Sequence, residues 1–237
     1  LQTADGLGAA IGRTIAPVGN LKMASRVTPP PADQVTKFRD AIARPVLLAA
    51  STHQGEDAFA LDAFEQVRKS HAQALLVIVP RHPSRGDEIA AQIRAPGLAC
   101  QQWSKDRASP NSVIDVLVAD TIGELIFWFA VADAIYLGGA TAEGVGGHNA
   151  IESAQLGRRV FTGPHGFNFR DTFETLAGAS ALVIGSAPEE LAAYWRGELA
   201  GNADPVSTGD LFAAFQAPFD ATVDAIVAML PASTTGA

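Results

Sequence analysis

The residues best suited to chemistry lie in and beside a glycine-rich stretch, GGATAEGVGGHNAIESAQLG, between Gly138 and Gly157. Glycines let a backbone approach a ligand closely with its N–H groups exposed. A helix expected to start near Asn149 would point its free N–H groups at the same place, which favours an anion. A carboxylate one turn further on, Glu152, would repel phosphate but suits the two hydroxyls of a ribose. The stretch therefore predicts a nucleotide site, although it matches neither GxGxxG nor a P-loop.

Two further polar segments, STHQGE and PRHPSR, each follow an apolar run and add basic groups. Arg81 comes directly after Pro80, and arginine binds phosphate or carboxylate in a bidentate manner. We expect Arg81 to face a ligand, with a surface ion pair as the alternative, which suits Arg85 better. His53 is a second candidate, whereas His82 is expected to brace its loop.

Simpler local roles stay open for several of these polar residues. Glu152 could cap its helix beside Asn149, and His148 could bond the backbone of its own loop. Helix N-caps, which serine, threonine and aspartate favour, are the alternative for the polar residues that follow two of the apolar runs: Ser51, Thr52, Asp120 and Thr121.

The elements that must position these residues alternate between short apolar runs and helical patterns. The expected strands are Val46–Ser51, Ala74–Pro80, Val113–Asp120, 134–139, 159–164 and 181–185. The expected helices begin at or near Gln54, Gly86, Thr121, Asn149, Phe169, Pro188 and Leu211, and Phe127 and Trp128 are expected in the core. This alternation predicts an α/β fold, a doubly wound, mostly parallel Rossmann-like sheet with helices on both faces. The polar segments then share the carboxyl edge of the sheet, where such folds bind ligands.

The composition narrows the class of partner. The formal net charge of −8 over 237 residues argues against nucleic acid as the main partner. The single cysteine, Cys100, excludes an internal disulfide and is consistent with the cytosol. The longest apolar run, Leu125–Ala132, is too short to span a bilayer. Scattered histidines without HxH or HExxH spacing favour a site that uses no metal.

The chain is expected to contain one main domain. It begins without methionine, so we expect it to be part of a longer or processed protein. Residues 1–34 would form a lead-in segment that ends in a stiff, proline-rich link, Val27–Gln34. Residues 35–231 would form the Rossmann-like domain, and residues 232–237 a frayed tail.

Six segments in matching order resemble the 3-deoxy-D-manno-octulosonic acid (Kdo) transferases. They are GNLKM (Gly19–Met23), AASTHQGED (Ala49–Asp57), VPRHPSR (Val79–Arg85), ADTIGEL (Ala119–Leu125), VGGHNAIESAQLG (Val145–Gly157) and TGPHGFNF (Thr162–Phe169). The sequence departs from the family pattern at Ile122, where methionine is common, and at Ala150 and Ser153, where the family has prolines. Loss of these prolines is expected to loosen the loop without disabling it.

The resemblance implies the C-terminal, donor-binding half of a GT-B glycosyltransferase with two Rossmann-like domains. The donor would be CMP-Kdo and the acceptor a lipid A precursor, in lipopolysaccharide biosynthesis at the cytoplasmic side of the bacterial inner membrane. The general base and the acceptor site would lie in the N-terminal domain. This chain would therefore contain no catalytic residue, need no cofactor or metal, and be soluble and inactive alone.

Carried over residue by residue, the resemblance places the phosphate on Arg81, the CMP on Asn149 and its ribose on Glu152. It sets Lys22 and His53 beside the Kdo carboxylate or the phosphate. The remaining donor-binding residues expected are Pro80, Ile122, Gly123, Gly147 and His148, with Gly123 and its neighbours beside the cytosine. Two alternatives remain open, a GT-B donor domain for another nucleotide sugar and a non-catalytic sugar-nucleotide-binding module.

Overall fold

The computed structural model describes residues 27–202, 206, 216–217, 219–224 and 226. Residues Arg26–Thr208 make up one compact unit, and the fold and site below belong to it. The GNLKM segment, Lys22 and the expected tail lie outside the described residues. Of the helix expected over Leu211–Met229, the backbone is helical at 216–217, 219–224 and 226, and the other positions are outside the described residues.

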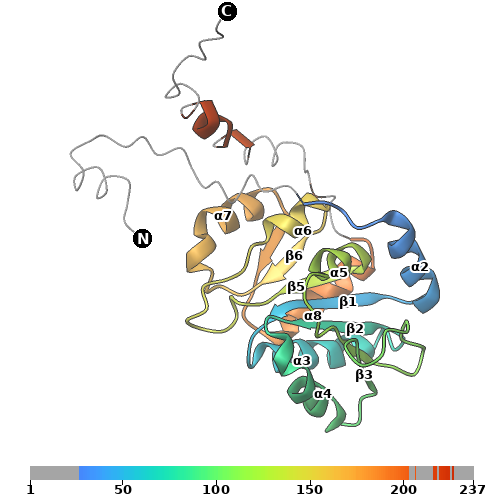
Figure 1. The fold of residues 1–237 in the computed structure, drawn as a ribbon. Helices are drawn as coiled ribbons and strands as arrows, with labels where there is room; N and C mark the ends of the chain where they lie inside the picture. Colours follow the sequence, from blue (N-terminus) through green and yellow to red (C-terminus); the bar gives the residue numbers. More distant parts are fainter. Residues whose placement is uncertain (1–26, 203–205, 207–215, 218, 225, 227–237) are drawn as a thin grey trace, which may run out of the picture. The chain divides into compact units, whose positions relative to one another are not determined.

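The core of this unit is a seven-stranded, entirely parallel sheet (Figure 1). Its strands are β1 (Val46–Thr52), β2 (Leu75–Pro80), β3 (Cys100–Gln102), β4 (Val116–Val118), β5 (Ala134–Leu137), β6 (Val160–Thr162) and β7 (Leu182–Ile184). Every residue of β1, β2, β4, β5 and β6 is buried, as expected for strands covered on both faces. The fold class predicted from the sequence is confirmed.

The strand order β3-β4-β2-β1-β5-β6-β7 places the functional edge. The chain runs outward from β1 through β2 on one side, and from β5 through β6 and β7 on the other. The carboxyl ends of β1 and β5 therefore flank the topological switch point, where doubly wound folds form their ligand crevice.

The helices form two layers, one on each face of the sheet (Figure 1). The first layer contains α3 (Glu56–Arg68), α4 (Gly86–Arg94) and α8 (Pro188–Leu199). The second contains α2 (Ala32–Ile42), α5 (Leu125–Val131), α6 (Ile151–Gln155) and α7 (Arg170–Gly178). Short 3₁₀ turns, η2 (Pro83–Arg85) and η3 (Phe167–Phe169), precede α4 and α7. The two layers leave the carboxyl edge of the sheet to the loops.

Two elements were not expected from the sequence. Strand β3 has only three residues and no apolar run. It lies at the edge of the sheet, where its backbone hydrogen bonds with β4 define it as a strand. Helix α2 begins at Ala32, inside the expected proline-rich link, which is free of helix and strand only from Val27 to Pro31. Its buried residues Phe38 and Ile42, four apart, are the helical signal that the sequence contained.

Two expected helices start later than the sequence indicated. The helix expected from Thr121 starts at Leu125, because Gly123 has a left-handed φ of +86° and interrupts any helix there. The helix expected from Asn149 starts at Ile151 and has only five residues. Because both helices start later, an irregular loop precedes each of them at the carboxyl edge, and each loop contributes to the site described below.

Candidate functional site

An open cavity of about 440 Å³ lies at the carboxyl edge of the sheet, within the size range of small-molecule sites. It is lined by Ser51, Val79, Pro80, Arg81, His82, Pro83, Thr121, Ile122, Gly123, Leu125, Leu137, His148, Asn149 and Glu152. These residues come from the carboxyl ends of β1, β2 and β5 and from the segments that follow β2, β4 and β5, which are far apart in the sequence. The sheet therefore brings the four polar segments together, as their positions after apolar runs predicted.

Seven of the ten residues expected to bind the donor line this cavity: Pro80, Arg81, Ile122, Gly123, His148, Asn149 and Glu152. His53 lies behind His148 and contacts its ring. Gly147 does not line the cavity; its amide donates a hydrogen bond to the carbonyl of Gly139 at 2.7 Å. Lys22 is outside the described residues. Their roles toward a ligand stay predictions.

Arg81 is the basic residue of the cavity best placed to meet an anion. Its backbone amide bonds the carbonyl of Thr52 at 3.0 Å, which anchors the residue beside β1. Its side chain is exposed and, among the described residues, it makes no ion pair and no side-chain hydrogen bond. The guanidinium is thus available to a phosphate or carboxylate in the cavity.

Glu152 and Asn149 have separate roles at the start of α6. The Asn149 side chain accepts a hydrogen bond from the amide of Ile151 at 3.0 Å, so it fixes the turn before the helix. The Glu152 carboxylate has no hydrogen-bond or ion-pair partner within the described part of the chain, and burial raises its pKa above the ordinary value. The structure therefore does not show Glu152 as a cap, and its oxygens are free to accept from hydroxyl groups.

His53 and His148 form a close pair beside the cavity. Their Nε2 atoms are 2.9 Å apart and their rings stack with centroids 5.1 Å apart. Burial lowers the pKa of His148 to about 4, and the neighbouring His53 and Arg81 act in the same direction. Burial also lowers the pKa of His53. Both rings are therefore neutral near pH 7, and one donates a hydrogen bond to the other.

The lowered pKa of His148 predicts a pH-dependent stability. The unfolded chain takes up this proton near pH 6.5, whereas the folded chain resists protonation down to about pH 4, so stability is lost as the pH falls through this window. We expect His148→Gln to flatten the dependence of the unfolding free energy on pH by up to about one bound proton. Urea titrations between pH 4 and 7 measure this slope. His71→Gln, at a ring bonded to Ser70, is the control, and equal slopes for both variants would contradict the prediction.

The amides of the glycine-rich loop differ from the expectation. The amides of Gly139, Thr141 and Ala142 bond the buried carboxylate of Glu56, at 2.7 to 3.2 Å. The sequence had suggested that amides of this stretch bind a phosphate. These three are not free to do so, because Glu56 occupies them. Nor does a five-residue helix such as α6 supply much dipole. Local sequence patterns do not reveal this role of Glu56, because the three loop amides lie 83 to 86 residues away in the sequence.

The helix-cap alternatives for Ser51, Thr52, Asp120 and Thr121 are wrong, because the N-caps of α3 and α5 are Gly55 and Glu124 and neither helix start has a side-chain cap hydrogen bond. Thr52 donates its hydroxyl to Asp57 at 2.6 Å, and Ser51 sits at a β-bulge with a left-handed φ of +54°. Asp120 holds the loop after β3 by accepting from the backbone and hydroxyl of Ser104. Arg85 forms an ion pair, as the sequence suggested, but its partner Asp57 is buried and Arg85 itself is partly buried.

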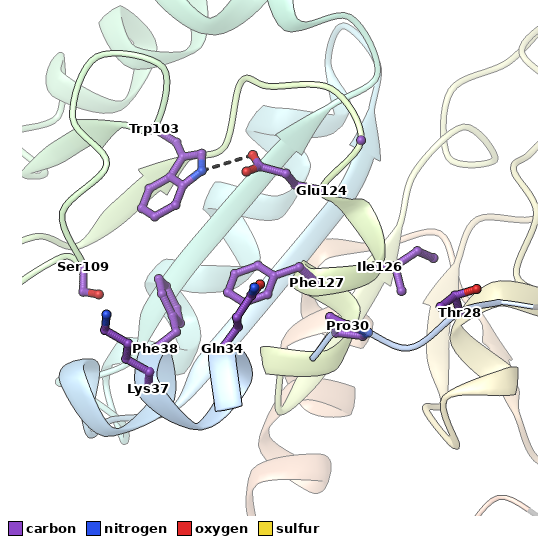
Figure 2. A pocket seen from close by; sticks show the side chains of 11 residues that line it. Thr28, Pro30, Gln34, Lys37, Phe38, Trp103, Ser109, Glu124, Ile126 and Phe127 are labelled. Carbon is purple, nitrogen blue, oxygen red and sulfur yellow. Dashed lines mark hydrogen bonds between the residues drawn. The ribbon is translucent and has the colours of Figure 1, made fainter. Parts of the chain in front are cut away.

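A second cavity, of about 520 Å³, lies between α2, α5 and the loop after β3 (Figure 2). The rings of Phe38, Trp103 and Phe127 border it, and the indole of Trp103 donates to Glu124 at 3.1 Å. Gly123 lines both cavities. Trp128 is buried as expected, whereas Phe127 is only half-buried and faces this cavity.

Among the described residues, no group of three or more histidine, cysteine, aspartate or glutamate side chains is arranged to hold a metal ion. None of the described helices combines the length and apolar character that crossing a bilayer requires.

The sheet, its two helical layers and the cavity at the switch point define a Rossmann-like domain of the GT-B glycosyltransferase type. The fold matches that of WaaG, a glycosyltransferase involved in lipopolysaccharide biosynthesis, with a TM-score of 0.50 at 14% identity over 81% of this chain and 50% of the other. A closer structural match is the C-terminal CMP-Kdo binding domain of WaaA from Acinetobacter baumannii. That match has a TM-score of 0.68 and 26% identity, and covers 84% of this chain and 99% of the other.

Sequence comparison finds relatives among the Kdo transferases. The Kdo transferase of Bordetella pertussis is 43% identical over 150 residues, which are 62% of this chain and 34% of the relative. A probable mitochondrial Kdo transferase of Arabidopsis thaliana is 32% identical over 139 residues, 59% of this chain and 31% of the relative. No family model matches the chain. The resemblance is confirmed: the chain is a relative of the Kdo transferases and corresponds to the C-terminal half of their GT-B fold. It spans about a third of the length of these curated relatives.

Proposed function

We propose that this chain is the donor-binding domain of a Kdo transferase and binds CMP-Kdo in the cavity at the carboxyl edge of the sheet. The observation that carries the proposal is that two groups of opposite charge, each without a partner among the described residues, line the same cavity. Arg81 offers a cation without a partner, and Glu152 offers a half-buried carboxylate without one, among the residues described. A nucleoside monophosphate carries the complementary groups, an anion and a ribose diol.

In this proposal Arg81 binds the phosphate and Glu152 accepts from the ribose hydroxyls. Gly123 and Ile122 border the cytosine, where the left-handed turn at Gly123 exposes its backbone. During transfer, CMP leaves from the anomeric carbon of Kdo. Arg81 would stabilise the negative charge that develops on the phosphate as this bond breaks.

The acceptor and the general base are assigned to the part of the relatives that this chain does not span. Transfer requires a base within hydrogen-bond reach of the acceptor hydroxyl. We propose that a lipid A precursor binds there, at the cytoplasmic side of the inner membrane. This chain alone is then expected not to transfer Kdo from CMP-Kdo to the precursor. Incubation of the chain with CMP-Kdo and lipid A precursor, followed by mass spectrometry, tests this division of roles.

The alternative donor is a sugar carried on a nucleoside diphosphate. A second phosphate would need further cationic or N–H groups, and the amides of Gly139, Thr141 and Ala142 are already bonded to Glu56. This occupancy favours a monophosphate donor. A non-catalytic nucleotide-binding module would retain the same cavity, and the activity of the full-length protein distinguishes it from a transferase.

Arg81→Ala is expected to weaken CMP binding about tenfold, because a charge-assisted hydrogen bond contributes about 1.5 kcal/mol or more. Isothermal titration calorimetry measures the change. The control is Arg94→Ala, at an exposed arginine near the end of α4 and distant from the cavity lining. EDTA is expected to leave both titrations unchanged, since the proposed contacts need no metal. Equal affinity in Arg81→Ala and the wild type would remove Arg81 from the site.

A further inference from the structure

Glu56 is a buried carboxylate to which no role in the donor site has so far been assigned. It is the first residue of α3 and only 2% exposed. No arginine or lysine is paired with it within the described residues, so backbone amides supply its compensation. A buried carboxylate is tolerated only where hydrogen bonds satisfy it.

Four backbone amides point at this one side chain. Oε1 accepts from Gly139 at 2.8 Å, Thr141 at 3.1 Å and Ala142 at 3.2 Å. Oε2 accepts from Gly139 at 2.7 Å and from His53 at 2.9 Å. Converging backbone amides of this kind form an anion-binding concavity. Here the anion is part of the protein, and it joins the loop after β1 to the loop after β5.

The glycines opposite Glu56 are required by this arrangement. A Cβ at Gly138 would come within 2.5 Å of Glu56 Oε2, a distance that real Cβ atoms essentially never show. Gly139 has a left-handed φ of +85°, and a Cβ there would come within 2.5 Å of the His148 ring. The two glycines thus let the loop approach the carboxylate on one side and the histidine on the other.

A short series of contacts connects Glu56 to the cavity. Gly139 bonds Glu56 through its amide and Gly147 through its carbonyl. The ring of His148 packs against Gly139 and lines the cavity. On the other side, Glu56 bonds the amide of His53, whose ring meets that of His148. Both histidines therefore depend on the same carboxylate for their positions.

We propose that Glu56 is a positioning residue for the donor: its carboxylate holds the loop 138–142 in the form that places His148 and Asn149 at the nucleotide cavity. It acts through these residues and does not touch the ligand. The inference rests on the proposed function, since it names a determinant of the same site.

Glu56→Gln tests this role with almost no change in volume. The amide nitrogen cannot accept, so at least two of these five hydrogen bonds are lost and at least one buried N–H group has no partner. CMP affinity is expected to fall on the order of tenfold. Glu56→Asp keeps the charge but is one methylene shorter, and a smaller loss is expected. The matched control is Glu65→Gln, at an exposed position of the same helix, with unchanged affinity expected.

Adding formate to a Glu56 variant distinguishes a role of the carboxylate in positioning the donor site from a role in stabilising the fold alone. In Glu56→Ala the four amides surround an empty, carboxylate-sized space, and added sodium formate is expected to restore CMP affinity. The titration is made at a temperature where circular dichroism shows the variant folded. Sodium chloride at the same ionic strength, and formate with the wild type, are expected to have no effect.

Amide hydrogen exchange provides a readout without nucleotide. The amides of Gly139, Thr141 and Ala142 are expected to exchange faster in Glu56→Gln than in the wild type, while those of β1 stay protected. If the wild type does not bind CMP, the proposed function fails, and this exchange measurement still decides whether Glu56 holds the loop.

Wild-type CMP affinity in folded Glu56→Gln and Glu56→Ala would overturn the proposal. So would an affinity loss that formate does not reduce. If none of the three variants folds, with or without formate, the carboxylate is a requirement of the fold and not of the nucleotide site, which also overturns it.

Discussion

Arg85→Ala is expected to lower the free energy of unfolding by about 3–5 kcal/mol, because it leaves the charge of Asp57 buried without its cation. The Asp57 side chain is 1% exposed, and among the described residues the hydroxyl of Thr52 is the one side-chain partner that it keeps once Arg85 is removed. Urea unfolding at pH 7 gives the change from the shift in midpoint.

Two variants bracket this expectation. Arg68→Ala removes a partly exposed partner of Asp115 and is expected to cost less than about 1 kcal/mol. The double variant Arg85→Ala, Asp57→Asn removes the buried charge as well and is expected to recover part of the loss. A loss below about 1 kcal/mol for Arg85→Ala alone would mean that Asp57 does not need its cation.

Gly163→Ala is expected to destabilise the fold by about 1–3 kcal/mol and to reduce CMP binding strongly. A Cβ at this position, directly after β6, would overlap the carbonyl of Ala140 and the amide of Thr141. These are backbone atoms and cannot turn aside as a side chain can. The displaced loop is the one whose amides bond Glu56, so the damage is expected to reach the cavity.

Gly197→Ala is the matched control for this substitution. Gly197 lies within α8, and a Cβ there would meet nothing within 4 Å. Alanine is expected to stabilise the helix by about 0.5–1 kcal/mol and leave CMP binding unchanged. Thermal unfolding and calorimetry on both variants measure the contrast. Gly163→Ala with wild-type stability and affinity would show that the loop can move without consequence.

The sequence predicted the parts of the fold that follow from local patterns. Runs such as those of β1 and β2 are almost wholly apolar because both faces of the sheet are covered, and such runs can be predicted from the sequence. Strand β3, with the residues Cys100–Gln102, has no such run, because its pairing with β4 is set by the tertiary fold. The start of α5 depended on the backbone conformation of Gly123, which composition does not determine.

The sequence predicted those residues of the site whose location follows from their position after an expected strand. Arg81 and Glu152 follow apolar runs and share the cavity, because parallel strands bring their carboxyl ends to one edge. The contacts between segments were not predictable in this way. Glu56 bonds Gly139, and His53 meets His148 95 positions away, so both depend on which strands neighbour β1. The adjacent glycines Gly138 and Gly139 were the available signal for a close backbone contact.

Calorimetric titration of the wild-type chain with CMP, UMP and GMP tests the central claim most directly. The account predicts that CMP binds, and that it binds at least about tenfold more tightly than UMP or GMP, the cost of leaving one buried hydrogen-bonding group unsatisfied. Arg81→Ala is included so that binding can be assigned to the cavity at the switch point. No binding of CMP, or equal binding of all three nucleotides, would contradict the assignment of this chain as a CMP-Kdo donor domain.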